Sequence, residues 1–534
     1  MAARQAHNLK VVGSNPTPAT SFSFLLVLLL FDMIYVIHKV NIKISMQKEY
    51  LFLGDESVNN GRYLLAVFHI IPVEGLRLAD VATEIAAESS TGSSISIGSS
   101  TEFSHSNNAK VYKIDEEKNL VWIAYPWDIF DSDGNVQNIL TFIAGNIFGV
   151  SEVKACKLLD VYFPPEMLVQ YDGPSYTLDD MREYLGVWDS PILGTIIKPK
   201  IGLSSHQYAE LAYDFWAGGG MFVKNDEPQA NQSFCPYEKM VDAIRIAMDR
   251  AEDETGKPKI HSFNVSAADF DTMLRRCDYI ISKMRPGSFA FLIDGVTAGW
   301  MAVQTLRKRY PNVFIHFHRA GHGAYTRSEN PIGYSVAVLT KFARLAGASG
   351  IHTGTAGVGK MAGDPETDIT AAHLALRIGA SGPHFDQVWT KVTNKDLDIV
   401  DMVEAEQRRW NADLRETFEE RILTKSNYYY PNDPSRVILK MSPIISGGLN
   451  PMLLKEFIEV MGTIDYITTM GGGVHSHPEG TRGGAAALVQ AYEAWKAGIE
   501  IEEYAKQNRE LSLAIEFYTQ NKTNTHKLKG YESV

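Results

Sequence analysis

The feature that most constrains the fold is a series of eight short apolar segments, each ending in a cluster of polar residues or glycines. In chain order they are ILGTIIKPK, GMFVKNDE, HSFNVS, FAFLIDG, VFIHFHRAGH, GIHTGT, PIISGG and YITTMGGG. Most successive segments are about 25 to 40 residues apart, which is room for a strand, a helix and two loops. The series predicts an α/β fold whose residues 186–498 form an eight-stranded (β/α)8 TIM barrel.

The chain before the barrel has a different pattern. Strand-like segments such as YLLAVFHII and LVWIAYP alternate with helical stretches such as LADVATEIAAESS and VQNILTFIAGNIFG. This pattern predicts a smaller α+β, ferredoxin-like domain over residues 46–185. A chain of 534 residues that is 45% hydrophobic is long enough to bury both cores.

Three further segments fall outside these two domains. Residues 1–45 contain an apolar run that Asp32 interrupts, and we expect this extension to lie outside the fold, with the working chain starting near Met46. We predict that residues 390–437 form a helical insertion on the barrel surface. This insertion is either exposed to solvent or part of a contact between subunits. Residues 499–534 predict a polar helical tail without recognisable chemistry.

Charge and cysteine content limit the class of partner. A formal net charge of −12 argues against nucleic-acid binding, which needs clustered Lys and Arg. The three cysteines, Cys156, Cys235 and Cys277, have no C-x-x-C spacing, which favours a reducing compartment over a disulfide framework. We therefore predict a cytoplasmic protein that acts on small molecules.

Ionisable residues follow almost every predicted barrel strand, at the end where barrels place their active sites. They are Lys198, Lys200, Lys224, Asp226, Glu227, Asn264, Asp294, His316, His318, Arg319, His322, His352 and Ser446. Lys198 and Lys200 are two apart in extended chain, so their ammonium groups lie close together and repel. The spacing of so many charges at one barrel face predicts an active site there.

The segment FVKNDE brings an amine to two carboxylates. Asp226 and Glu227 suit Mg²⁺, but the ammonium of Lys224 does not. Either Lys224 is a counter-ion in a salt bridge, which is the commoner case, or its amine is converted into an anionic oxygen ligand. The residues alone leave both alternatives open.

The segment HFHRAGHG carries three histidines and an arginine. An H-x-H pair can bind a transition metal, but Arg319 next to His318 would repel a dication. Acid/base or anion-binding roles fit these residues better than a zinc site. Purely structural roles are equally compatible with His316 and His322.

Glycine-rich loops follow the last three predicted strands. GTAGVGKMAGD predicts a lid that delivers Lys360 to a substrate, with an ordinary mobile turn as the alternative. The other two loops offer backbone N–H groups to an anion and contain Ser446, Gly447, Gly448, Gly471 and Gly472. Arg319 and His352 form a possible second anion site, which predicts a substrate with two phosphates.

In this order, GTIIKPK, FVKNDEPQ, HFHRAGHG, GIHTGT, GVGKM, ISGG and GGG resemble the large subunit of ribulose-1,5-bisphosphate carboxylase/oxygenase (rubisco), and AAESSTG and GNIFG resemble its N-terminal domain. These sequence motifs are more similar to those of form II and archaeal form II/III enzymes than to those of the plant type. The resemblance implies carboxylation of ribulose 1,5-bisphosphate with CO₂ to two 3-phosphoglycerate, with O₂ competing. A rubisco-like enolase or isomerase acting on a related phosphorylated sugar is the alternative.

The resemblance also implies roles for individual residues. Lys224, as a CO₂-derived carbamate, holds Mg²⁺ with Asp226 and Glu227, and the catalytic residues are Lys198, His318 and Lys360. Substrate contacts come from Glu88, Thr91, Asn146, Lys200, Arg319, His352, Ser446, Gly447, Gly448, Gly471 and Gly472. Because Glu88, Thr91 and Asn146 reach across from a partner subunit in this family, the resemblance implies a homodimer or a multimer of dimers, without a small subunit.

Two positions depart from the family pattern. Met221 stands where the family usually has Asp, three residues before the carbamate lysine, so we expect a charge that steadies the metal ligands to be missing. Ser93 and Ser94 replace the usual Thr followed by Trp or Asn, which is expected to loosen a loop over the substrate. Both changes predict slower activity rather than its loss.

Overall fold

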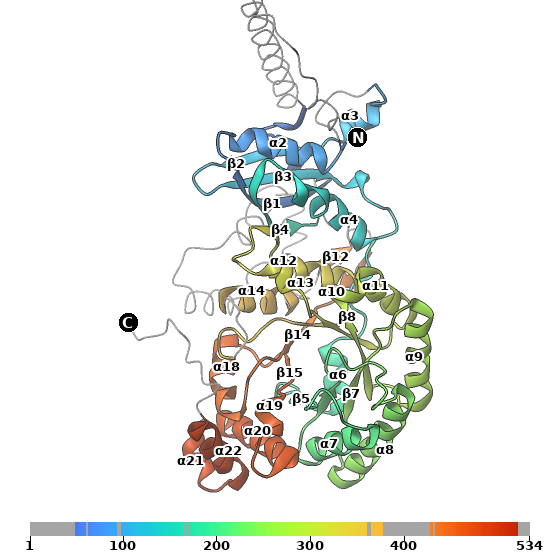
Figure 1. Ribbon diagram of the computed structural model, residues 1–534, viewed down its shortest axis with the longest axis vertical. Coiled ribbons are helices and arrows are strands. Elements are labelled where there is room, and N and C mark those ends of the chain that lie inside the picture. Colours follow the sequence, from blue (N-terminus) through green and yellow to red (C-terminus); the bar gives the residue numbers. More distant parts are fainter. Residues whose placement is uncertain are drawn as a thin grey trace, which may run out of the picture.

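The computed structural model describes residues 49–59, 62–92, 98–163, 167, 170–359, 365–376, 428–430 and 433–521. The apolar run before Met46, Ser93 and Ser94, Lys360 and most of the predicted insertion lie outside these residues. Figure 1 shows a sheet domain at one end of the molecule and a larger barrel below it. Within the described residues, no helix combines the length and the apolar character needed to cross a membrane.

The N-terminal domain is a four-stranded antiparallel sheet with helices on one side. Its elements are β1 (Tyr63–Pro72), α2 (Leu78–Glu88), α3 (Glu102–Ser106), β2 (Lys110–Asp115), β3 (Leu120–Pro126), α4 (Val136–Ile143) and β4 (Val153–Tyr162). The strand order β4-β1-β3-β2 and the β-α-β-β-α-β sequence are those of a ferredoxin-like domain. Val81 and Ile85 of α2 are fully buried against this sheet. The predicted α+β class is confirmed.

The barrel contains eight parallel strands in chain order. They are β5 (Gly194–Ile196), β6 (Phe222–Lys224), β7 (Ile260–Asn264), β8 (Phe289–Asp294), β9 (Phe314–His318), β11 (Gly350–His352), β14 (Ser442–Ile445) and β15 (Ile467–Thr468). A parallel bridge between Ile192 and Ile467 brings the last strand back to the first. Each strand coincides with one of the eight apolar segments, so the predicted barrel is confirmed.

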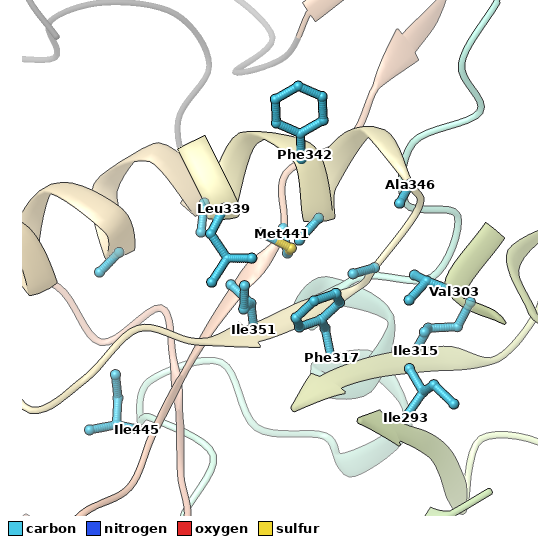
Figure 2. Packing of buried hydrophobic residues seen from close by; sticks show 14 of the residues in the cluster. Ile293, Val303, Ile315, Phe317, Leu339, Phe342, Ala346, Ile351, Met441 and Ile445 are labelled. Carbon is cyan, nitrogen blue, oxygen red and sulfur yellow. The ribbon is translucent and has the colours of Figure 1, made fainter. Parts of the chain in front are cut away.

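Helices surround the barrel. They are α6 (Leu178–Leu185), α7 (Ser205–Ala217), α8 (Tyr237–Thr255), α9 (Phe270–Lys283), α10 (Gly295–Ala298), α11 (Trp300–Arg309), α12 (Gly323–Thr326), α13 (Val336–Leu345), α14 (Pro365–Leu376), α18 (Leu454–Met461), α19 (Gly472–His475), α20 (Gly480–Lys496), α21 (Ile501–Ala505) and α22 (Arg509–Gln520). Ser204 begins α7 with a capping box, and Gly256 ends α8 in the left-handed conformation. Figure 2 shows Leu339 of α13 packed over Phe317 and Ile351 of the barrel wall.

One strand joins the two domains. β10 (Ile332–Tyr334) lies in the loop between β9 and α13 of the barrel, yet it pairs in parallel with β4 of the N-terminal sheet. Close by, the buried ammonium of Lys341 lies 2.7 Å from the Asp160 carboxylate of β4. The loop that follows β9 is therefore attached to both domains.

Part of the predicted insertion is described. β12 (Tyr428–Tyr430) and β13 (Asp433–Ile438) form a separate two-stranded antiparallel sheet where the sequence predicted the end of a helical insertion. The remaining part of that insertion falls outside the described residues.

Candidate active site

The carboxyl ends of the barrel strands open into a cavity of about 1290 Å³. Most of the residues predicted for the site line this cavity. They are Lys198, Asp226, Glu227, His318, Arg319, His352, Ser446, Gly447, Gly448, Gly471 and Gly472. The structure thus brings together, at one mouth, residues from six different strand ends.

Lys224 ends β6 and lies completely buried beneath the cavity. Its Nζ atom has no hydrogen-bond partner among the described residues. Burial lowers the pKa of Lys224 to about 8, although Asp226 and Glu227 oppose this shift. One pH unit below that value, at pH 7, roughly a tenth of this amine is therefore neutral and hence nucleophilic.

The two nearby carboxylates take their cations from a different strand. Lys198 contacts Asp226, and the Nζ atom of Lys200 lies 3.7 Å from Glu227 Oε1. The salt bridge that the sequence favoured for Lys224 is therefore made by Lys198. Because each lysine of the Lys198–Lys200 pair faces a carboxylate, the repulsion expected between them is offset. Lys200 is half-exposed and does not line the cavity.

Asp226 and Glu227 act as a coupled pair. Burial favours the protonated form of both, but hydrogen bonding with Glu227 and contact with Lys198 hold the pKa of Asp226 well below its usual value. Burial and the hydrogen bond with Asp226 raise the pKa of Glu227. Two carboxyl groups that compete for one proton form a site that an added cation would stabilise.

His318 lies between two carboxylates. Its Nε2 is 3.8 Å from Glu227 Oε2, and its Nδ1 is 3.6 Å from Asp294 Oδ1. Nδ1 also accepts a hydrogen bond of 3.2 Å from the backbone N–H of Ala320, so the neutral ring carries its proton on Nε2. Burial, followed by the charge of Lys224, lowers the pKa of His318 well below its usual value.

The first histidine of HFHRAGHG, His316, belongs to a buried chain of hydrogen bonds. His316 Nδ1 is 3.2 Å from Ser262 Oγ, and its Nε2 is 2.8 Å from His352 Nε2. His352 Nδ1 is in turn 3.0 Å from Ser446 Oγ, which lines the cavity. His316 is therefore linked to the substrate side of the site, although it does not line the cavity itself.

Arg319 is buried and has an unused donor. Its Nη2 lies 3.8 Å from Asp368 Oδ1, whereas Nη1 has no hydrogen-bond partner among the described residues. Asp368 also accepts hydrogen bonds of 3.1 Å from the backbone N–H groups of Thr355 and Ala356 in the loop after β11. Sequence reasoning missed Asp368, which lies inside a helix; a lone carboxylate in that setting gives no signal.

Three predicted substrate residues lie elsewhere. Asn146 Nδ2 donates to Glu88 Oε1 at 3.2 Å, and the Thr91 hydroxyl lies 2.5 Å from the Tyr50 hydroxyl, all in the N-terminal domain. Glu88, Thr91 and Asn146 do not line the cavity of their own chain. Their predicted role thus depends on a second subunit.

The structure corrects the interpretation of Met221. Met221 precedes β6, whereas Lys224 ends it, and three residues of extended strand span about 10 Å. The Met221 side chain packs against the apolar cluster at the opposite end of the barrel, beside Phe222 and Ile260. Met221 is therefore a packing residue at that end of the barrel. A charged residue at this position would lie about 10 Å from Lys224, too far to steady the metal ligands directly.

An α+β domain followed by an eight-stranded barrel, with ionisable residues gathered at the carboxyl ends of its strands, is the architecture of a barrel enzyme. A family model for the catalytic domain of the ribulose bisphosphate carboxylase large chain matches residues 177–400 and 402–518, and the model for its N-terminal domain matches residues 52–167. The chain belongs to the ribulose bisphosphate carboxylase large chain family.

Individual relatives agree with this assignment. The ribulose bisphosphate carboxylases of Rhodopseudomonas palustris (strain BisB18) and Rhodobacter capsulatus are 39% and 38% identical over 472 and 471 residues, which is 86% of this chain and 92% of each relative. The dimeric archaeal rubisco of Hyperthermus butylicus has a TM-score of 0.73 and 33% identity, covering 88% of this chain and 99% of that one. The octameric rubisco of Pyrococcus horikoshii OT3 has a TM-score of 0.72 and 30% identity, covering 88% and 98%.

Proposed function

We propose that this chain catalyses the carboxylation of ribulose 1,5-bisphosphate to two molecules of 3-phosphoglycerate, with O₂ as a competing substrate. The observation that carries this function is the buried, unbonded amine of Lys224 beside Asp226 and Glu227. The relatives described above are carboxylases by name, and none of them is the enolising relative that the sequence left as an alternative.

The residues fit a carbamate and Mg²⁺. A neutral lysine amine can attack CO₂, lose a proton and become a carbamate, which adds a third anionic oxygen donor to Asp226 and Glu227. Mg²⁺ prefers such oxygen ligands. When bound, the ion would polarise the oxygens of a sugar substrate. A carbamate on Lys224 would supply the third oxygen ligand beside Asp226 and Glu227.

The remaining residues bind the substrate and move protons. Lys198 and His318 lie at the cavity wall, next to the carboxylate pair, where they can take up or deliver a proton at the sugar carbons. The free Nη1 donor of Arg319 serves one phosphate, and His352, whose two ring nitrogens bond to His316 and Ser446, acts on the substrate through Ser446. Ser446, Gly447 and Gly448 and, after the last strand, Gly471 and Gly472 offer polar contacts to the anionic substrate. Lys360 keeps its predicted role on a lid that lies outside the described residues.

The active unit we propose is a homodimer, or a multimer of dimers, without a small subunit. Glu88, Thr91 and Asn146 would enter the cavity of the partner subunit, since they do not line their own. The solved relatives named above are described as dimeric and octameric.

The proposed function is tested with labelled bicarbonate, ribulose 1,5-bisphosphate and Mg²⁺. Labelled 3-phosphoglycerate is expected from the natural chain and not from Lys224→Ala. A product that persists in the lysine variant would exclude the carbamate.

Lys259 provides a matched control within the same chain. It is also buried, and burial lowers its pKa to about 8, but its Nζ donates to the carbonyl oxygens of Trp216 and Gly220 at 3.1 and 3.2 Å and faces no carboxylate pair. Trapping of ¹³C-labelled CO₂ followed by mass spectrometry is expected to label Lys224 and leave Lys259 unmodified. Equal labelling of both lysines would show that burial alone, rather than the metal site, directs the reaction.

A further inference from the structure

The C-terminal helix α22 forms part of the cavity wall. Phe517 and Tyr518 on this helix, and Asn521 just after it, line the cavity together with Gly471, Gly472 and Ser476. Figure 1 shows α22 at the bottom of the barrel, next to α20 and α21. The sequence predicted a polar helical tail without recognisable chemistry over this stretch and gave no sign that it would reach the cavity.

The first turn of α22 is firmly attached to the barrel. Leu511 and Ala514 are fully buried, and the backbone N–H of Leu511 donates to Gln490 of α20 at 2.9 Å. Gln490 also donates to the Glu510 carboxylate at 2.7 Å, and His477 Nε2 lies 2.9 Å from the Glu510 carbonyl oxygen. These bonds hold α22 against α20 and against the turn that precedes α20. They therefore fix where the last turn of α22 lies.

The last turn of α22 contacts the loop after β15. The Tyr518 hydroxyl donates to the carbonyl oxygen of Gly472 at 3.2 Å. The same oxygen accepts a bond of 3.1 Å from the backbone N–H of Ser476, so both of its acceptor positions are used. Burial raises the pKa of Tyr518 to about 12, so its phenol remains a donor throughout the range in which enzymes work.

This glycine segment is held by backbone contacts alone. Gly471, Gly472 and Gly473 have no side chains that could anchor them, and they lead into the short helix α19, whose first turn is closed by bonds from the N–H groups of Val474 and His475 to the Gly471 carbonyl oxygen. On one side the loop packs against Leu449, because a Cβ atom added to Gly473 would lie 2.0 Å from the Leu449 carbonyl oxygen. Tyr518 adds a contact from α22, to the carbonyl oxygen of Gly472.

We propose that Tyr518 is a positioning residue that fixes the 471–473 loop in the orientation that binds one phosphate of the substrate. The hydroxyl does not touch the reacting carbons; it acts through the Gly472 peptide. This inference rests on the proposed function, in which the 471–473 loop is a phosphate subsite. It makes the C-terminal helix a determinant of substrate affinity rather than of the chemical step.

The test is Tyr518→Phe, which removes the hydroxyl and keeps the ring that contacts Phe517. We expect KM for ribulose bisphosphate to rise by about 3-fold to 10-fold, the effect of losing one neutral hydrogen bond, with kcat within about twofold. The matched control is Tyr504→Phe on the adjacent helix α21, because the Tyr504 hydroxyl has no hydrogen-bond partner within the part of the chain that the structure describes. An unchanged KM in Tyr518→Phe, or a loss confined to kcat, would overturn the inference.

A second measurement separates this inference from the proposed function. Calorimetric titration with inorganic phosphate reports on the subsite without any turnover. Weaker phosphate binding by Tyr518→Phe than by the natural chain, with Tyr504→Phe unchanged, supports the positioning role even if no 3-phosphoglycerate is made. Equal phosphate affinity in all three proteins would overturn it even if the natural chain is an active carboxylase.

Discussion

The Nε2 atoms of His316 and His352 lie 2.8 Å apart in the barrel interior, so one imidazole must donate to the other. Burial is the main cause that lowers the pKa of each ring well below its usual value, and both rings are therefore neutral. With Ser262 at one end and Ser446 at the other, neutrality gives a continuous chain in which each ring donates once and accepts once. The chain couples the tautomers of the two rings, so the proton position on His316 decides whether His352 Nδ1 donates to Ser446 or accepts from it.

His316→Leu tests this chain. The substitution leaves His352 Nε2 without its partner in a buried site, so we expect KM for ribulose bisphosphate to rise by about tenfold. His316→Gln keeps an amide that can hydrogen-bond to His352 Nε2, so its KM is expected to lie between those of the natural chain and His316→Leu. Steady-state kinetics of both variants provide the measurement. Equal KM values for the two variants and the natural chain would show that His316 does not influence substrate binding through His352.

Activation by CO₂ is expected to follow the protonation of Lys224. Its pKa is lowered from 10.5 to about 8, so the neutral amine increases as pH rises through about 8 and changes little above it. The initial rate of ¹³CO₂ trapping at Lys224, measured from pH 6 to 10 at fixed dissolved CO₂, should rise and then level off near that value. A midpoint close to 10.5 would show that the amine is not desolvated as described.

The lowered pKa of Lys224 also predicts that the free energy of unfolding changes with pH. Between pH 8 and 10.5 the unfolded chain holds a proton on Lys224 that the folded chain has released, so this residue's contribution to folding stability rises with pH across that window. Lys224→Met is expected to remove that part of the slope. The measurement is the denaturant midpoint as a function of pH without CO₂ and Mg²⁺; identical slopes for the two proteins would contradict the prediction.

Met221→Asp is expected to destabilise the protein without helping the metal site. The new carboxylate would lie against the apolar cluster with Phe222 and Ile260, and because this position is only partly buried the desolvation costs about 1–3 kcal/mol. Met221→Leu conserves volume and should cost less than about 1.5 kcal/mol. Thermal unfolding and Mg²⁺ titration of the two variants provide the test. Tighter Mg²⁺ binding by the Asp variant would restore the earlier interpretation of this position.

The shared site is tested by mixing subunits. Lys224→Ala and Asn146→Ala are each expected to be inactive as homodimers, but a mixed dimer contains one site with both natural residues. Refolding the two variants together should recover roughly a quarter of natural activity, because half of random dimers are mixed and each has one intact site. Lys224→Ala mixed with Lys198→Ala is the control. Both of those residues lie in the same barrel, so no site is restored.

The sequence predicted those parts of the molecule that are continuous along the chain. All eight barrel strands were found because each is an apolar segment with a polar end, and residues at six of those ends meet in one cavity. The predictions that failed concern contacts between segments that are far apart in the sequence. Asp226 pairs with Lys198 rather than with Lys224, although the latter is closer in sequence. Tyr518, 46 residues beyond Gly472, gave no signal because a single tyrosine on a polar helix is unremarkable until the fold places it.

The strand that crosses from the barrel into the N-terminal sheet has a consequence for dissecting this protein. Removing the barrel would strip β10 from β4 and expose a row of unpaired backbone groups on residues 156–158, an edge prone to pair with other chains. It would also leave Asp160 buried without its lysine. The N-terminal unit is thus not an independent module, and expressed alone it should aggregate.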